Sequence, residues 1–175
     1  MKRMWIDRFR GEPVAVVALA VFVLSSATLA GAWYFQLVLK ILPCSLCLEQ
    51  RISYYVVVPL SLLMVIAALV RAPRKLLTVG FVAIIVAILC GAALAAYHAG
   101  VEWHFWVGAT DCSGPLSDLT EKGPLLDQLH SVSVVRCDQA SWRLLGISLA
   151  GYNVPISLAL AAIASFGLRA SERTD

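Results

Sequence analysis

Charged residues are scarce in this sequence, and their scarcity excludes a water-soluble domain. Only 14% of the 175 residues are charged, whereas 60% are hydrophobic, and the mean hydropathy is +0.81. A soluble domain of this length needs far more charge on its surface. The sequence also has no internal repeat and no low-complexity tract. We therefore expect one integral membrane domain over residues 1–175.

The shortage of charge is concentrated in four stretches that have no charged residue: 14–39, 52–70, 76–97 and 144–168. Each is long enough to cross about 30 Å of hydrocarbon as a helix. Helices satisfy their own backbone hydrogen bonds, which lipid cannot do. The sequence therefore predicts an all-α fold, a polytopic membrane protein with a four-helix transmembrane bundle.

The first stretch has an alternative interpretation as a cleaved signal peptide. It follows a basic start, and Ala30-Gly31-Ala32 resembles a cleavage site. However, a signal core is usually about 7–15 residues, and this run is much longer. Trp33, Tyr34 and Phe35 look like an aromatic belt at the end of a retained span.

Lysine and arginine are distributed unequally over the segments between the spans. Nine lie in the two terminal tails and the "RAPRK" turn, whereas five lie in segments 40–51 and 98–143. Positive charge is enriched on the cytoplasmic side. We therefore expect both termini to be cytoplasmic, and the two outer loops to face the periplasm if the source is bacterial. The asymmetry explains the net charge of +3 and gives no argument for nucleic-acid binding.

Four of the five cysteines lie in the two predicted outer loops. Cys44 and Cys47 are in the first loop, and Cys112 and Cys137 are in the second. Disulfides persist on such an oxidising face and not in the cytosol. The fifth, Cys90, lies in the middle of the third span, where we expect an unreactive packing residue.

The first pair lies in the stretch "PCSLCLEQR", residues 43–51. A bond between Cys44 and Cys47 closes so small a ring that it is a poor structural staple, but it is suited to opening and closing. Pro43 fits the first turn of a helix, whose positive end favours a thiolate. Arg51 is one helical turn after Cys47, so its charge would add to this effect. Alternatively, Arg51 anchors a helix end by snorkelling.

The second pair, Cys112 and Cys137, lies in segments that contain Gly, Pro and Ser, which a soluble partner could reach. A purely structural disulfide between them remains an alternative. Residues 124–132 place four apolar side chains on one helical face, which indicates either a short helix on the membrane surface or a plain loop.

Zinc is the main rival ligand for the four loop cysteines. Structural zinc sites generally use two close-spaced ligand pairs, and this chain has only one. His98, His104 and His130 show no metal spacing. We therefore predict no metal site.

The cysteine motif also carries a family resemblance. "PCSLCLEQR" resembles the Pro-Cys-x-x-Cys-x-x-x-Arg signature of the bacterial disulfide bond formation protein B (DsbB) family. "WRLLGISLAGYN", residues 142–153, looks like the start of that family's last span. Together with the four spans and the second cysteine pair, the resemblance covers nearly the whole chain.

The resemblance implies a membrane thiol:quinone oxidoreductase that supports disulfide formation. A periplasmic, thioredoxin-fold DsbA-like partner would attack Cys112, the released Cys137 would attack Cys44, and Cys47 would be left facing the quinone. The catalytic residues implied are thus Cys44, Cys47, Cys112 and Cys137. Ubiquinone or menaquinone would bind near Arg51 and His98 and carry electrons to the quinone pool of the respiratory chain, within the lipid bilayer of the bacterial inner membrane.

Other interpretations remain open at this point. His98 could be an interfacial histidine without a special role, and Trp103, Phe105 and Trp106 fit an interfacial belt better than a quinone contact. A relative of vitamin K epoxide reductase would keep its Cys-x-x-Cys on a late helix, unlike this chain. A non-enzymatic membrane protein with structural disulfides would have cysteines that never cycle. Transport finds little support, because the spans contain no charge.

Overall fold

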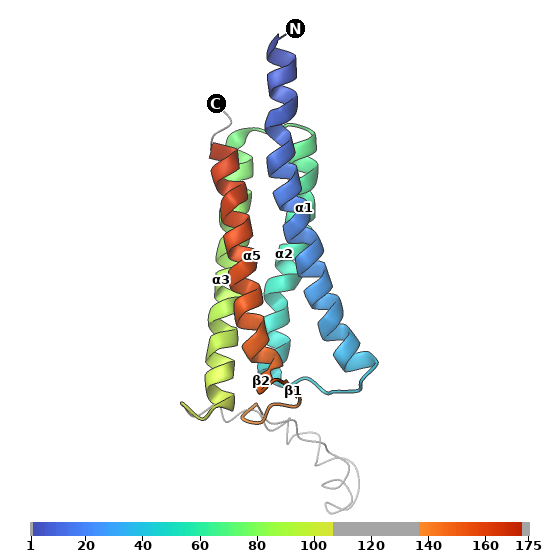
Figure 1. Ribbon diagram of the computed structural model, residues 1–175, viewed down its shortest axis with the longest axis vertical. Helices are drawn as coiled ribbons and strands as arrows, with labels where there is room; N and C mark the ends of the chain where they lie inside the picture. Colours follow the sequence, from blue (N-terminus) through green and yellow to red (C-terminus); the bar gives the residue numbers. More distant parts are fainter. Residues whose placement is uncertain (1, 107–136, 173–175) are drawn as a thin grey trace, which may run out of the picture.

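The protein is a bundle of four long helices. The computed structural model describes residues 2–106 and 137–172, with side chains from residue 13 onward. The helices are α1 (Lys2–Leu37), α2 (Ser45–Leu69), α3 (Arg74–Glu102) and α5 (Leu149–Glu172). They lie side by side (Figure 1), and all four are long and apolar enough to cross a membrane. The predicted four-helix membrane bundle is confirmed.

The helix ends and the described segments that connect the helices lie at the two opposite ends of the bundle. α1 begins and α5 ends at one end, where the turn between α2 and α3 also lies (Figure 1). The link from α1 to α2 lies at the other end, together with a small hairpin. The cysteine motif and the predicted cytoplasmic turn are therefore separated by the full length of the bundle. Which end faces the cytoplasm stays a prediction from the charge distribution.

The helix ends differ from the predicted span ends. α2 begins at Ser45 rather than at residue 52, and α3 continues to Glu102 rather than ending at residue 97. Absence of charge marks where a chain meets lipid, whereas a helix continues through charged residues at the membrane boundary. The last helix begins at Leu149, after residue 144, because the apolar residues before it form the hairpin.

The hairpin consists of β1 (Arg143–Leu144) and β2 (Ile147–Ser148), paired antiparallel with Leu144 opposite Ile147. Its turn residues, Leu145 and Gly146, have φ angles of 52° and 83°. Positive φ at both central positions is the geometry whose twist suits a two-residue hairpin loop. Ser148 Oγ then accepts a hydrogen bond from the backbone N–H of Gly151, at 3.0 Å. This cap fixes where α5 begins.

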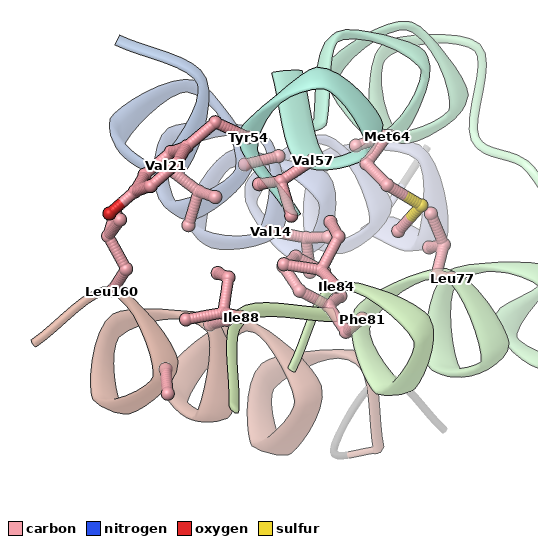
Figure 2. Close-up of a cluster of buried hydrophobic side chains, with 14 residues drawn as sticks. Val14, Val21, Tyr54, Val57, Met64, Leu77, Phe81, Ile84, Ile88 and Leu160 are labelled. Carbon is pink, nitrogen blue, oxygen red and sulfur yellow. The ribbon is translucent and has the colours of Figure 1, made fainter. Parts of the chain in front are cut away.

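The core of the bundle is apolar and closely packed. α3 packs mainly against α5, and α1 mainly against α2. Figure 2 shows buried side chains from all four helices meeting between them: Val14, Val21, Tyr54, Val57, Met64, Leu77, Phe81, Ile84, Ile88 and Leu160. Small residues allow the helices to approach. At Gly167 of α5, a Cβ atom would overlap the ring of Phe81.

The outer surface of the bundle is also apolar, as lipid contact requires. Large apolar side chains such as Val16, Leu63, Val79 and Phe166 are more than half exposed. Cys90 lies on this outer surface, because its side chain is exposed in the middle of α3. The packing residue expected at Cys90 therefore lies on the outer surface of the bundle and not between helices. Periodicity could not show its direction, since α3 is apolar on all faces.

Candidate functional site

The two cysteines of the motif lie together at the start of α2. Cys44 is the N-cap residue, with extended backbone angles (φ −74°, ψ 170°), and its Sγ accepts a hydrogen bond from the backbone N–H of Cys47 at 3.3 Å. The two Sγ atoms are 2.9 Å apart, with both cysteines present as free thiols. Pro43 precedes the cap rather than occupying the first turn. The predicted placement of both sulfurs at a helix N-terminus is confirmed.

The two cysteine sulfurs differ in their affinity for a proton. The Cys44 thiol donates its hydrogen to the Cys47 sulfur, and Cys44 is also buried. These two effects raise the pKa of Cys44 from 9.0 to about 12, in that order of size, although His98 acts in the opposite direction. The proton of the pair therefore stays on Cys44. The Cys47 sulfur accepts that hydrogen bond near the positive end of α2, which suits it to carry negative charge.

His98 lies beside the cysteine pair, near the end of α3. Its side chain is fully buried, and its Nε2 atom is 3.6 Å from Cys44 Sγ. The same nitrogen is 3.7 Å from Oε1 of Glu102, one helical turn further along α3. The other oxygen of Glu102 is buried and has no hydrogen-bond partner among the described residues. The structure thus brings His98 to the sulfurs and adds the carboxylate of Glu102, to which the sequence did not point.

A chain of polar side chains continues from His98 into the bundle. Gln50 Nε2 is 2.7 Å from His98 Nδ1, and Gln50 Oε1 accepts a hydrogen bond from Asn153 at 2.8 Å. Asn153 Oδ1 in turn accepts from the hydroxyl of Tyr54 at 2.6 Å, and this hydroxyl lies 3.2 Å from Ser157 Oγ. The chain connects α2, α3 and α5. Each member of this polar chain thereby finds a partner, which lipid would not supply.

Arg51 is buried and points toward α1 rather than toward the sulfurs. Its guanidinium donates hydrogen bonds to Gln36 Oε1 at 2.5 Å and to the carbonyl oxygen of Ala32 at 3.2 Å. It also lies over the ring of Trp33, 5.9 Å from the ring centre. The spacing of four residues from Cys47 correctly places Arg51 near the site. It did not reveal that α1 supplies the partners.

Cys137 of the second pair lies next to the first pair. Its side chain is 2% exposed and packs with Cys44 and Leu46, and its Sγ atom is 3.5 Å from Ser45 Oγ. This burial differs from the expectation of an accessible loop residue. Cys112, His130 and the predicted helix 124–132 lie outside the described residues, so their positions stay predictions.

A pocket of about 310 Å³ opens beside the cysteines, between α1, α2 and the start of α5. Its wall contains Cys44, Cys47, Arg51 and His98, so four predicted site residues share one cavity. Most of the remaining wall is apolar, with Leu29, Phe35, Ile41, Leu42, Trp142 and Ile156 among its residues. Such a mixture of apolar walls and a few polar groups is typical of small-molecule sites.

The aromatic residues after α3 lie apart from this pocket. Trp103, Phe105 and Trp106 are exposed and contact one another, and Trp106 stacks on Tyr97. Trp106 Nε1 donates a hydrogen bond to the carbonyl oxygen of Tyr97 at 3.0 Å. None of the three belongs to the pocket wall. This arrangement favours the interfacial belt over a quinone contact.

The fold and the site together define a multi-pass membrane protein with a partly buried dithiol beside an apolar pocket. Comparison with known families gives the particular identity. The family model for "Disulfide bond formation protein DsbB" matches residues 14–167. The chain therefore belongs to the DsbB family, as its motif suggested, and is an oxidoreductase of disulfide bond formation.

Several curated relatives carry the name "Disulfide bond formation protein B". The protein of Verminephrobacter eiseniae is 28% identical over 97% of this chain and 94% of its own length. That of Xylella fastidiosa is 30% identical over 87% and 88%, and that of Xanthomonas campestris is 32% identical over 81% and 84%. No solved structure matches this chain.

Proposed function

We propose that this protein is a membrane protein-dithiol:quinone oxidoreductase of the bacterial inner membrane. It reoxidises a periplasmic, thioredoxin-fold, DsbA-like partner and passes two electrons to ubiquinone or menaquinone. The net reaction is dithiol plus quinone to disulfide plus quinol, so two electrons and two protons move together. The redox loops lie on the periplasmic side, and the electrons enter the quinone pool of the respiratory chain.

The observation that carries this proposal is the contact of Cys137, from the second cysteine pair, with the first pair. Cys137 packs against Cys44, although the two residues are far apart in sequence and belong to different outer loops. Structural disulfides do not require two pairs to touch. Thiol–disulfide exchange does, because one sulfur must attack another directly.

Electrons pass from the partner to the chain by thiol–disulfide exchange. A thiolate of the partner attacks Cys112 of the Cys112–Cys137 disulfide, so one S–S bond forms and Cys137 leaves as a thiolate. Cys137 then attacks Cys44 of the Cys44–Cys47 disulfide, and Cys47 leaves as the thiolate. The partner's second thiol releases the partner as a disulfide, and the two electrons are now held by the chain's own sulfurs. Cys47 is the leaving sulfur because the end of α2 stabilises its charge.

The pocket beside the cysteines fits a quinone head group. Its volume of about 310 Å³ and its apolar walls suit a flat ring, and Arg51 and His98 supply polar groups on the wall. A bound quinone would supply the acceptor for two electrons and two protons. Arg51 would hold a quinone oxygen as negative charge develops there. His98, at 3.6 Å from Cys44 Sγ, is placed to take the Cys44 proton.

The test is a quinone-reduction assay with purified protein in detergent. A reduced thioredoxin-fold partner is added with ubiquinone, or separately with menaquinone, and quinone absorbance is followed. Wild type should consume quinone, whereas Cys47→Ser and Cys112→Ser should not. The matched control is Cys90→Ser, which removes an exposed cysteine that does not line the pocket and should behave as wild type. Quinone consumption by Cys47→Ser, or none by wild type with either quinone, would overturn the proposal.

A further inference from the structure

Three strong metal-ligand atoms converge at the candidate site. Cys44 Sγ, Cys47 Sγ and His98 Nε2 all lie within 4.8 Å of one another. A zinc ion binds sulfur at about 2.3 Å and nitrogen at about 2.0–2.1 Å, so its tetrahedral ligand atoms lie about 3.3–3.8 Å apart. The observed separation of Cys44 Sγ from His98 Nε2 is 3.6 Å, which is within this range. The two sulfurs, at 2.9 Å, need to separate by less than about 1 Å.

Glu102 gives an independent indication of a cation, although its carboxylate lies outside this group of three and must turn toward the sulfurs to become a fourth ligand. Its Oε1 atom lies 3.7 Å from His98 Nε2, and its side chain is 94% buried, since 6% is exposed. Its Oε2 atom has no hydrogen-bond partner among the described residues, although it is buried and the residue lines the pocket. A buried carboxylate oxygen without a partner is costly unless a cation or a donor reaches it.

The charge around this cluster also favours a cation when the cysteines are reduced. Two thiols that can become thiolates lie beside a buried carboxylate. The nearby guanidinium of Arg51 donates its hydrogen bonds to Gln36 and Ala32 of α1. Two thiolates, an imidazole and a carboxylate form a ligand set that suits Zn²⁺ and disfavours Mg²⁺ or Ca²⁺.

The residues behind His98 can support it as a ligand. When Nε2 binds a metal, Nδ1 carries the hydrogen and needs an acceptor. Gln50 lies 2.7 Å from Nδ1, and turning its amide over presents Oε1 to that hydrogen. The Asn153 amide and the Tyr54 hydroxyl come next in the chain of hydrogen bonds, and each can both donate and accept. Their hydrogen bonds can therefore reverse direction when the Gln50 amide turns.

We propose that the reduced pair Cys44–Cys47, with His98 and Glu102, binds a thiophilic divalent cation such as Zn²⁺. Binding exchanges two thiol protons for the ion, and no electron is transferred. In the disulfide form the sulfurs are not thiolates, so only the reduced protein binds. The ion thereby holds the dithiol reduced and blocks regeneration of the Cys44–Cys47 disulfide. This blocking role rests on the proposed function, whereas the binding itself does not.

The binding is tested with Co²⁺ as a spectroscopic probe, without quinone or partner protein. Full-length protein, reduced with a phosphine under anaerobic conditions, should bind one Co²⁺ per chain and show a thiolate-to-cobalt charge-transfer band. Zn²⁺ should displace it, and oxidised protein should show no band. Cys44→Ser and Cys47→Ser should abolish the band, and Glu102→Gln and His98→Gln should each weaken binding roughly tenfold or more.

Matched controls separate this site from other thiols and histidines. Cys90→Ser, the exposed His104→Gln, and the double change Cys112→Ser with Cys137→Ser should all keep the band. A band that needs Cys112 or Cys137, or that survives both Glu102→Gln and His98→Gln, would overturn the proposal. So would equal binding to oxidised protein.

A second measurement uses only wild-type protein, so it does not depend on the folding of a variant. Iodoacetamide labelling of reduced protein, resolved by residue with mass spectrometry, should slow at Cys44 and Cys47 when Zn²⁺ is present, but not at Cys90. Equal labelling with and without Zn²⁺ would refute binding. If Co²⁺ binds and quinone is never consumed, the metal site stands and the proposed function fails.

Discussion

The side-chain amide of Gln50 lies 2.7 Å from Nδ1 of His98, and this contact joins α2 to α3 beside the cysteine pair. It fixes the plane of the imidazole ring and leaves Nε2 directed to Cys44 and Glu102. Because Gln50 is also held by Asn153 of α5, three helices share one polar connection. The orientation of His98 is therefore a property of the bundle and not of α3 alone.

Replacing Gln50 should destabilise the protein. Gln50→Leu leaves the buried His98 Nδ1 and the half-buried Asn153 amide without their partner, which costs about 1–3 kcal/mol of unfolding free energy. We expect a clear fall in the thermal unfolding midpoint in detergent. Glu49→Leu, at the neighbouring exposed position, is the matched control and should leave the midpoint nearly unchanged. Equal midpoints for the two variants would show that the polar chain does not stabilise the bundle.

Reactivity of Cys44 should depend on pH in an unusual way. Because its pKa is raised from 9.0 to about 12, the thiolate fraction stays small at pH 9 and keeps rising up to about pH 12. Site-resolved alkylation of reduced protein should therefore show no plateau for Cys44 between pH 9 and 11, whereas an ordinary cysteine peptide levels off above pH 9. In Cys47→Ser, the hydrogen bond to a sulfur is lost, and the Cys44 curve should shift to lower pH. An unshifted curve in that variant would assign the raised pKa to burial instead.

The same pKa makes stability of the reduced protein depend on pH. A thiol whose pKa is higher in the folded than in the unfolded chain stabilises the fold while it is protonated in both states. This contribution is complete below about pH 9 and is lost as the pH rises toward 12. Unfolding midpoints of reduced wild type should fall through this range. Cys44→Ser should show a shallower fall, and identical slopes would argue against the assignment.

Arg51 should not tolerate replacement by lysine. Its guanidinium donates to Gln36 and to Ala32 on α1, and a lysine ammonium cannot span both acceptors in that fixed geometry. In the proposed function Arg51 also holds a quinone oxygen, and losing that charge-assisted hydrogen bond costs about 1.5–3 kcal/mol. This corresponds to a roughly 10–100-fold fall in kcat/KM. The quinone-reduction assay measures this change. Wild-type kcat/KM in Arg51→Lys, with normal unfolding, would remove Arg51 from the quinone site.

Two glycines should respond in opposite ways to an added methyl group. At Gly167, a Cβ atom overlaps the Phe81 ring, so Gly167→Ala forces the ring to move and should destabilise the bundle by about 1–3 kcal/mol. At Gly31, no atom lies within 4 Å of the position of a Cβ. Gly31→Ala should be neutral or stabilising by up to about 1 kcal/mol, because alanine favours helix. Thermal unfolding of the two variants in one detergent measures the difference directly.

The sequence predicted the bundle because uncharged stretches of span length have few other solutions. The cysteine motif and its helix N-terminus followed from local spacing. The direction in which each side chain points was harder to predict. Neither the outward direction of Cys90 nor the α1 partners of Arg51 could be predicted, because spacing along one helix does not show which neighbouring helix will lie opposite. These positions depend on how α1, α2 and α3 pack together.

The polar chain and Glu102 were missed for a different reason. Gln50 and Tyr54 lie on α2 and Asn153 lies on α5, both mostly apolar helices, and only the meeting of these residues in space makes them a group. A signal was nevertheless present, because isolated polar residues within spans usually find partners across helices. His98 and Glu102 are four residues apart, the spacing of one helical turn, which places both on one face.

The hydrogen bond that caps α2 couples the chemical state of the Cys44 sulfur to the backbone of the helix. Cys44 Sγ is the acceptor for the amide hydrogen of Cys47, so the atom that closes the first turn of the helix is also the one to which the proposed exchange assigns a change of bond. In that exchange Cys44 would turn toward Cys137, and the amide would lose its acceptor. Hydrogen–deuterium exchange at this one amide then reports the progress of the reaction, because the helix loosens at its first turn each time the sulfur changes partner.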